Sequence, residues 1–260
     1  MALKGKVALV TGSTSGIGLG IAEALADEGA DIVMNGFGDP AQIETVRADL
    51  AARGVRVVYS PADISKPADC EAMVKLAHDS FGSLDILVNN AGVQYVSDIA
   101  DFPAEQWDRV IAINLSGAFH AMHFAIPGMK AKGWGRIINI SSAHGLVASP
   151  QKAAYVAAKH GIIGLTKVAA LELANDGITA NSICPGWVLT PLVQKQLEDR
   201  AAKEGTSVEA MAQEFLKEKQ PMLQFSTAKE IGGLAVFLCS DNAKTITGTS
   251  MSIDGGWVAE

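Results

Sequence analysis

The sequence has few cysteines, and their spacing would hold neither a disulfide framework nor a zinc ion. Its 260 residues include Cys70, Cys184 and Cys239, an odd number with no CxxC pair. Domains stabilised by disulfides or structural zinc carry paired cysteines at short spacing. The sequence therefore predicts a protein that folds without disulfides, in the reducing cytoplasm.

Long apolar runs and basic clusters are also missing. The N-terminus has only a short apolar stretch before glycines and hydroxyl residues, so we expect no signal peptide. No run reaches the roughly 18 apolar residues of a membrane helix. The net charge is −7, with no block of Lys or Arg. We therefore expect no membrane and no nucleic acid among the partners, and a small-molecule substrate instead.

Short apolar, β-branched runs alternate along the chain with helical patterns. The expected strands are residues 7–11, 32–35, 55–60, 86–89, 137–141, 178–183 and 251–254. The expected helices are residues 16–28, 41–52, 67–81, 104–131, 153–174 and 228–240. Strands that are apolar throughout are typical of parallel sheets covered on both faces. The pattern predicts an α/β fold with a doubly wound parallel sheet of about seven strands.

One segment interrupts this alternation. Residues 191–220 are charged and helical in pattern, and they lie between the sixth and seventh expected strands. No linker, repeat or shift in composition marks a second domain. We therefore expect residues 1–260 to form a single domain, with residues 191–220 as an inserted helical lid.

A glycine-rich loop follows the first expected strand and leads into a helix. Gly12, Gly16 and Gly18 have GxxxGxG spacing. Glycines allow close backbone approach, and a helix N-terminus offers unpaired N–H groups to a pyrophosphate. Such a turn can equally be glycine-rich for packing alone. The loop indicates a dinucleotide site only together with other features.

The end of the second expected strand bears on which dinucleotide would bind. Residues 35–39 read NGFGD, without a basic residue, and the loop carries Ser15 before its second glycine. A 2′-phosphate would lack a cation there, so the sequence predicts NAD instead of NADP. Phe37 covers the adenine or anchors its loop. Asp63 with Ile64 binds the adenine edge, or Asp63 caps a helix.

Tyr155 and Lys159 are the strongest catalytic candidates. They are four residues apart in an expected helix, so their side chains share one face. A phenol has a pKa of about 10 and needs a nearby cation to act as a base at neutral pH. Asn90 and Ser142 follow two expected strands, and parallel strands bring these ends to the edge where ligands bind.

Together these motifs resemble those of the short-chain dehydrogenase/reductase family over the whole chain. In order, they are Thr-Gly-x-x-x-Gly-x-Gly at 11–18, Asn-Asn-Ala-Gly at 89–92, Asn114, Ser142, Tyr155-x-x-x-Lys159 and Pro185-Gly186. The resemblance implies a Rossmann fold, a nicotinamide cofactor and hydride transfer at a secondary alcohol or ketone.

The resemblance also implies a catalytic tetrad. Tyr155 would exchange a proton with the substrate oxygen, and Ser142, favoured over Ser141 by the family spacing, would hydrogen-bond that oxygen. Lys159 would lower the pKa of Tyr155 and hold the nicotinamide ribose, and Asn114 would orient a water. The expected cofactor contacts are Gly12, Thr14, Ser15, Gly16, Ile17, Gly18, Phe37, Asp63, Ile64, Asn90, Ala91, Gly92, Tyr155, Lys159, Pro185, Gly186, Val188 and Thr190.

Residues outside these motifs predict a small anionic substrate. The expected substrate contacts are Gln94, Ser142, His144, Lys152, Tyr155, Trp187, Gln196 and Trp257. Polar donors with aromatic walls suit a carboxylate, although each residue singly is more often solvated or packed. Residues 35–37, 142–149 and 183–188 resemble the family members that oxidise (R)-3-hydroxybutyrate to acetoacetate with NAD. The resemblance further implies a homotetramer built on the apolar helices near 110–129 and 153–174.

Other chemistries fit less well. The GxSxG and GxxxxGK[ST] motifs are missing. His120 and His123 have no third ligand nearby, so no metal is expected, and Cys184 is expected to fill the core. Two alternatives stay open: another activity of the family, such as NADP-linked reduction of 3-oxoacyl thioesters, and a non-catalytic NAD-binding protein. The missing cation near Ser15 disfavours the first, and the intact tetrad disfavours the second.

Overall fold

Seven parallel strands form the centre of the protein in a computed structural model that describes residues 1–259, apart from the side chain of Leu192. Their order is β3-β2-β1-β4-β5-β6-β7. They are β1 (Val7–Val10), β2 (Asp31–Asn35), β3 (Val57–Ser60), β4 (Ile86–Asn89), β5 (Gly135–Ile140), β6 (Ile178–Pro185) and β7 (Ser250–Ile253). Winding reverses between the β1–β3 half and the β4–β7 half, which confirms the predicted doubly wound sheet.

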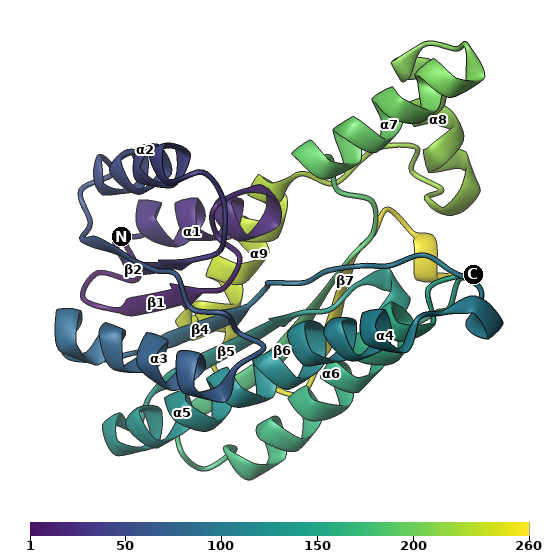
Figure 1. Ribbon diagram of the computed structural model, residues 1–260. Helices are drawn as coiled ribbons and strands as arrows, with labels where there is room; N and C mark the ends of the chain where they lie inside the picture. Colours follow the sequence, from purple (N-terminus) through teal and green to yellow (C-terminus); the bar gives the residue numbers. More distant parts are fainter. Residues whose placement is uncertain (260) are drawn as a thin grey trace.

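Helices cover both faces of the sheet (Figure 1). One face carries α1 (Gly16–Asp27), α2 (Pro40–Ala51) and α9 (Ala228–Cys239). The other carries α3 (Pro67–Phe81), α5 (Gly117–Lys132) and α6 (Ala153–Glu172). Ile21 of α1 and Ile231 of α9 belong to one buried cluster, and Met73 of α3 and Met129 of α5 belong to the other. Because both faces are covered, the central strands are buried along their whole length.

The helix expected at residues 104–131 is divided. It consists of α4 (Ala104–Ile111), a π-helical segment η2 (Ala112–Ser116) and α5. By length and composition alone this stretch, Ala104–Lys132, could cross a membrane. A helix that covers a sheet passes the same test, and here Ala121 and Ala125 of α5 are buried in the core.

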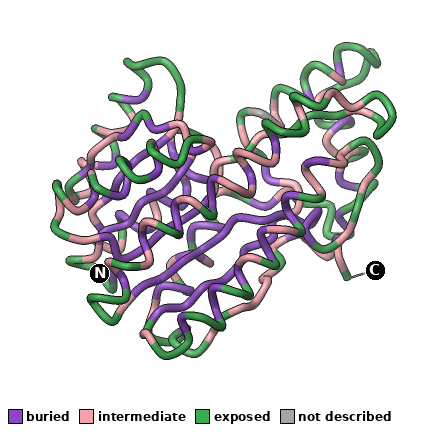
Figure 2. Tube along the Cα trace, turned by 60° about the horizontal axis from the view of Figure 1, so that its bottom comes forward, coloured by how far each residue is buried: buried purple, intermediate pink, exposed green. Residues whose placement is uncertain are grey.

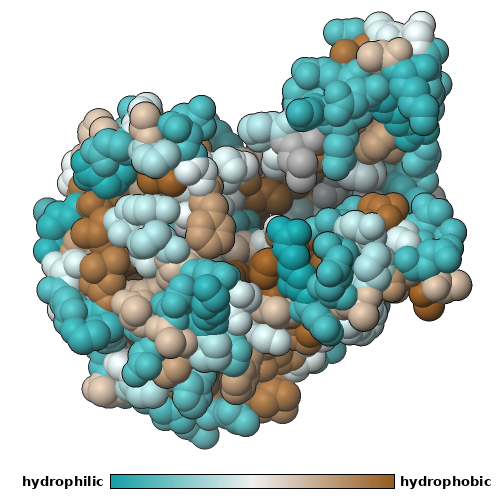
Figure 3. All heavy atoms as spheres, in the orientation of Figure 1, coloured by the Kyte–Doolittle hydropathy of each residue, from teal (hydrophilic) through white to brown (hydrophobic). Residues whose placement is uncertain are grey.

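Between β6 and β7 the chain forms α7 (Pro191–Glu204) and α8 (Val208–Lys219), which stand away from the sheet (Figure 1). Leu197, Ala201 and Met211 form a small core between them, and most of their other residues are exposed (Figure 2). The surface is hollowed between this pair and the sheet, with hydrophobic atoms at the bottom (Figure 3). The helices expected at 191–220 are therefore present.

Several boundaries differ from the sequence expectations by two residues. β3 begins at Val57 instead of residue 55, and β5 begins at Gly135 instead of residue 137. The polar Arg136 pairs with Ile86 of β4 and Thr179 of β6 and so belongs to β5, and its guanidinium lies 4.4 Å from the ring centroid of Trp134. Short helical turns complete the fold: η1 (Ile99–Asp101), η3 (Ala143–Gly145), η4 (Asp241–Ala243) and η5 (Trp257–Ala259). The three cysteines are free and buried.

Candidate active site

The glycine loop is tied to the end of β4 by side-chain hydrogen bonds. The Thr11 hydroxyl oxygen accepts the N–H groups of Asn90 at 2.9 Å and Ala91 at 3.1 Å. The Asn90 amide donates to the carbonyls of Thr11 at 2.9 Å and Gly12 at 3.2 Å. The side chain of Asn90, expected to contact the cofactor, is therefore used to hold the loop.

Two glycines are needed in this loop for different reasons. Gly16 has a φ of +58°, which L side chains rarely adopt. Gly18 has no unusual φ, but a Cβ there would lie 2.3 Å from the Gly12 carbonyl oxygen and 2.4 Å from Nδ2 of Asn90. The loop and α1 therefore touch backbone to backbone, which explains the GxxxGxG spacing physically.

The start of α1 suits a pyrophosphate. Ser15 is the N-cap residue, but its side chain makes no capping hydrogen bond, and the first turn carries no acidic residue. N–H groups of the first turn thus remain for an anion, at the positive end of the helix dipole. Thr190 lies beside this turn, since a Cβ on Gly16 would be 3.5 Å from its methyl group. The donors present fit a dinucleotide.

The turn after β2 offers backbone instead of charge. Asn35 is buried, its amide donating to the carbonyls of Ser60 at 3.1 Å and Ala62 at 2.9 Å. Asp39 accepts the N–H groups of two α2 residues and caps that helix. Phe37 is 68% exposed, so it does not anchor its loop by packing. This leaves Phe37 free to cover a bound adenine.

Asp63 is occupied by its own turn. Its carboxylate accepts both the hydroxyl of Ser65 at 2.7 Å and the N–H of Ser65 at 3.1 Å. This bonding to Ser65 lowers the pKa of Asp63. Ile64 is buried. Asp63 thus closes a turn before α3 and does not cap that helix, whose N-cap residue is Lys66, and the backbone of Ile64 is left as the group that could contact the adenine edge.

The end of β5 separates the two candidate serines. Ser141 donates to the carbonyl of Lys159, within α6, at 2.9 Å and so faces that helix. Ser142 begins η3, and its oxygen accepts the N–H of His144 at 3.1 Å. Burial raises the pKa of Tyr155, and a hydrogen bond with the Ser142 side chain offsets part of that rise. Ser142, and not Ser141, therefore faces the phenol.

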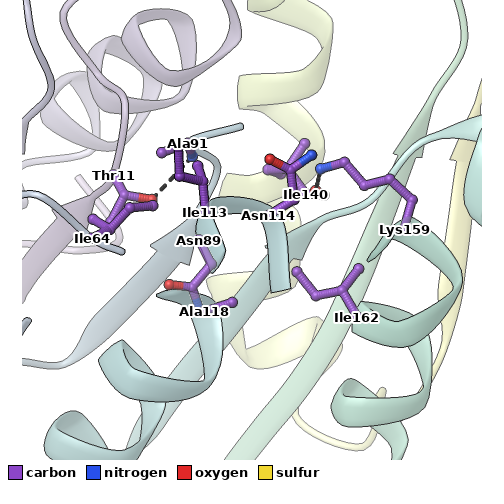
Figure 4. Close-up of a pocket in the computed structure, with 10 residues that line it drawn as sticks. All are labelled: Thr11, Ile64, Asn89, Ala91, Ile113, Asn114, Ala118, Ile140, Lys159 and Ile162. Atoms are coloured by element: carbon purple, nitrogen blue, oxygen red, sulfur yellow. Dashed lines mark hydrogen bonds between the residues drawn. The ribbon is translucent and has the colours of Figure 1, made fainter. Parts of the chain in front are cut away.

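Lys159 supplies the cation near Tyr155. It is only 4% exposed, and its Nζ donates to the carbonyl of Ile140 at 2.7 Å. The same Nζ lies 5.5 Å from the ring centroid of Tyr155. Burial lowers the pKa of Lys159 to about 8, so the ammonium form still predominates at neutral pH. Lys159 and Asn114 line one small hollow at the sheet edge (Figure 4).

Asn114 lies in the π segment η2, and its side chain is fully used. Its Oδ1 accepts the N–H of Val93 at 2.8 Å, and its Nδ2 donates to the carbonyl of Val93 at 2.9 Å. The resemblance predicts that Asn114 orients a water. Because both polar ends of the side chain bind Val93, its peptide group is what remains for that role.

Five of the expected substrate residues form one cluster. The ring centroid of His144 lies 6.0 Å from that of Tyr155 and 5.0 Å from that of Trp257. Trp257 lies 5.7 Å from Trp187, and Nζ of Lys152 lies 5.5 Å from the Trp187 ring. The cluster borders the phenol with two aromatic walls and one primary amine.

The charge in this cluster resides on one residue. Burial, then the charge of Lys152, lowers the pKa of His144 to about 4, so its ring is neutral near pH 7. Its Nε2 is 2.9 Å from the hydroxyl of Ser149. Lys152 immediately precedes α6, and burial lowers its pKa. His144 can therefore offer a neutral hydrogen bond, while Lys152 carries the positive charge that an anion needs.

The other expected residues are more dispersed. Gln94 and Gln196 are exposed, and neither makes a side-chain hydrogen bond to the rest of residues 1–259. Val188 is buried in the core that contains α1 and α9. Pro185 ends β6, and a Cβ on Gly186 would lie 2.7 Å from Oε1 of Gln220. Gly186 is thus required by packing, whatever else it contacts.

Gln220 and Asp254 are buried polar residues that the sequence analysis missed. Oε1 of Gln220 accepts the backbone N–H of Trp187 at 2.9 Å. Asp254 accepts the N–H groups of Gly256 at 3.1 Å and Val258 at 3.0 Å, which holds the turn that carries Trp257. Gln220 ends a charged run of sequence, so no local pattern distinguishes it from a solvent-exposed glutamine.

The histidine pair on α5 is part of an aromatic surface. The His123 ring stacks on Phe119 with centroids 6.0 Å apart, and His120 contacts the same phenylalanine edge-on at 5.4 Å. Among the residues that the structure describes, no group of three His, Cys, Asp or Glu residues could hold a metal ion. Packing accounts for these two histidines.

Comparison with known proteins identifies the family to which the chain belongs. Residues 12–258 match the family model described as enoyl-(acyl carrier protein) reductase. The chain belongs to the short-chain dehydrogenase/reductase family, whose members bind a nicotinamide cofactor. The resemblance inferred from the motifs is therefore confirmed.

Two proteins of similar sequence and one solved structure are relevant to the function. The chain is 61% identical to D-beta-hydroxybutyrate dehydrogenase of Cupriavidus necator, over 99% of this chain and 100% of that protein. It is 57% identical to the D-beta-hydroxybutyrate dehydrogenase of Rhizobium meliloti, over 98% of this chain and 99% of that protein. A solved structure of L-sorbose reductase from Gluconobacter frateurii, complexed with NADPH and L-sorbose, is 33% identical with a TM-score of 0.95, covering 100% of both chains.

Proposed function

We propose that this protein oxidises (R)-3-hydroxybutyrate to acetoacetate, reversibly, with NAD. The observation that carries the proposal is the single cluster in which Tyr155 borders His144, and Lys152 lies beside Trp187. It joins a proton-transfer group to a cation and apolar walls, as a small hydroxy acid requires. High identity to two D-beta-hydroxybutyrate dehydrogenases supports the same substrate.

The residues divide the work of the reaction between them. Tyr155 accepts the proton of the C3 hydroxyl, and Ser142 hydrogen-bonds the same oxygen. Lys159 favours the phenolate through its nearby positive charge. Lys152 holds the substrate carboxylate with help from His144, while Gln94 and Gln196 complete the hydrogen bonding once α7 approaches. The glycine loop and the start of α1 would hold NAD, which would supply the acceptor for the hydride from C3.

The preference for NAD is part of the proposal. Asn35 and Asp39 use their side chains inside the fold, and neither the β2 turn nor Ser15 presents a cation for a 2′-phosphate. The L-sorbose reductase structure holds NADPH, so the choice within the family depends on such local residues. We expect kcat/KM with NAD to exceed that with NADP at least tenfold.

The direct test is to measure NADH formation by the increase in NADH absorbance. We expect turnover with (R)-3-hydroxybutyrate, and much slower turnover with the (S)-enantiomer and with the methyl ester. A 3-oxoacyl thioester, supplied with NADPH, tests the main alternative. Faster reduction of that thioester would overturn the proposal in favour of the alternative, and absence of turnover with every pair would favour a non-catalytic binding protein.

A substitution in the glycine loop tests the cofactor site. Gly18→Ala places a methyl group 2.3 Å from the Gly12 carbonyl oxygen, and such overpacking costs about 1–3 kcal/mol. We expect NADH binding, measured by fluorescence titration, to weaken roughly tenfold or more. Gly233→Ala is the control, since a Cβ there meets nothing within 4 Å. Equal NADH affinity in both variants would contradict this placement of the cofactor.

The proposal extends to the organisation of the chain. Residues 1–260 act as a single Rossmann-type domain in which 191–220 closes as a lid over the substrate. Four copies assemble through α4–α5 and α6, whose outer faces expose Phe119 and Leu171, the latter 81% exposed. Buried free thiols suit a reducing cytoplasm. Light scattering of the purified protein measures the number of copies.

A further inference from the structure

A second hollow borders the aromatic cluster from the side of α8. Its volume is about 340 Å³, and Lys217, Lys219, Gln220 and Trp257 are among the residues that line it. Glu218, between the two lysines, lies 3.9 Å from Arg200. Within residues 1–259 neither lysine forms an ion pair. Two lysines that form no ion pair therefore line this hollow together with Trp257 and Glu218, in a protein whose net charge is −7.

The position of Lys219 is determined by its neighbour Gln220. The Gln220 side chain is 1% exposed, its Oε1 accepts the Trp187 N–H, and its Nε2 donates to the carbonyl of Gln224. The end of α8 is thereby fastened to Trp187, over whose ring Lys152 lies. Lys219 directly precedes this anchored residue and lines the same hollow as Trp257, whose ring lies 5.0 Å from that of His144, although Lys219 is exposed itself.

Lys219 acts electrostatically on the expected substrate residues. Its positive charge contributes to the lowered pKa of Lys152, after burial, and to that of His144, after burial and Lys152. His160 adds a smaller effect of the same sign on His144. The other ionisable groups around the cluster are Tyr155 and Lys159 on α6, Lys217 and Glu218 on α8, and Asp254 in the turn that carries Trp257. Lys152 and Lys219 therefore repel one another, and a bound anion would relieve that repulsion.

We propose that Lys219 is a specificity-determining residue, which together with Lys152 selects a carboxylate-bearing substrate at the end of α8. This inference rests on the proposed function and deepens it. Lys152 contacts the carboxylate, while Lys219 supplies a local positive potential that an overall acidic protein otherwise lacks. Because Lys219 is exposed, its contribution is screened by salt.

The test compares Lys219→Gln with Lys217→Gln, which removes a charge from the same helix and the same hollow. In Lys219→Gln we expect kcat/KM for (R)-3-hydroxybutyrate to fall about threefold to tenfold at low ionic strength. The loss should lie in KM, shrink at high salt and be absent for the methyl ester. Lys217→Gln should change kcat/KM less than twofold, because Lys217 contributes to the lowered pKa of neither Lys152 nor His144.

A pH profile separates an electrostatic role from a structural one. Loss of a positive charge near Lys152 raises the pKa of Lys152, so its ammonium form persists to higher pH. The rise of KM at alkaline pH should therefore begin at higher pH in Lys219→Gln than in the wild type. An unchanged profile, or equal losses for acid and ester, would overturn the role of Lys219. Absence of wild-type turnover with (R)-3-hydroxybutyrate would instead overturn the proposed function itself.

Discussion

Replacing Tyr155 by phenylalanine should reduce kcat for (R)-3-hydroxybutyrate by about a thousandfold or more. The phenol faces the side chain of Ser142, and Nζ of Lys159 lies 5.5 Å from its ring centroid. A positioned acid or base contributes about 10²–10⁴ in rate, and phenylalanine retains the ring but neither donates nor accepts the proton. Stopped-assay measurement of NADH detects a residual rate of this size.

Cofactor binding distinguishes this loss from damage to the fold. The phenylalanine ring keeps the contact with His144, so NADH affinity should stay within about threefold of the wild type. Tyr95→Phe is the matched control, because Tyr95 is exposed and its ring meets Phe102 at 5.4 Å. Near-normal kcat in Tyr155→Phe would contradict the assignment of the proton-transfer residue.

Replacing Lys152 by methionine should raise KM for (R)-3-hydroxybutyrate by about tenfold to a hundredfold. A hydrogen bond to a charged group contributes about 1.5–3 kcal/mol, and each 1.4 kcal/mol is tenfold in affinity. Methionine retains an apolar chain over the Trp187 ring, where Nζ of Lys152 now lies. The effect should appear in KM more than in kcat, because Lys152 binds the substrate carboxylate and not the reacting carbon C3.

The substrate's own charge provides the control. The methyl ester of (R)-3-hydroxybutyrate has no carboxylate, so its slower turnover should be unchanged in Lys152→Met. Lys152 also loses its ammonium form as pH rises, and burial lowers the pKa of Lys152, so wild-type KM for the acid should increase below the pH expected of an ordinary lysine. Equal losses for acid and ester would show that Lys152 does not bind the carboxylate.

The backbone of the site could be predicted from local patterns. Parallel strands require that Gly12, Asn90 and Ser142 emerge at one sheet edge, and the helical repeat places Tyr155 and Lys159 on one face. These relations depend only on chain geometry, and the structure has the sheet and helices that they assume.

Side-chain partners were less predictable. Asn90 and Asp63 were expected at the dinucleotide site and Asn114 in the catalytic tetrad, but their polar atoms bind Gly12, Ser65 and Val93, respectively. A short polar side chain satisfies whichever backbone group lies nearest when buried, and the sequence does not reveal which group that is. For the same reason the structural role of Gln220 was not foreseen.

The sequence by itself determined the class of fold, the order of the motifs and the family, because each depends on hydrophobic periodicity and on residue spacing along the chain. Only the tertiary structure decided that the side chains of Asn90 and Asn114 bind Gly12 and Val93, and that Lys219 acts on Lys152, which lies 67 positions earlier in the sequence. Electrostatic and hydrogen-bond interactions depend on distance through space, and folding alone brings such distant residues together.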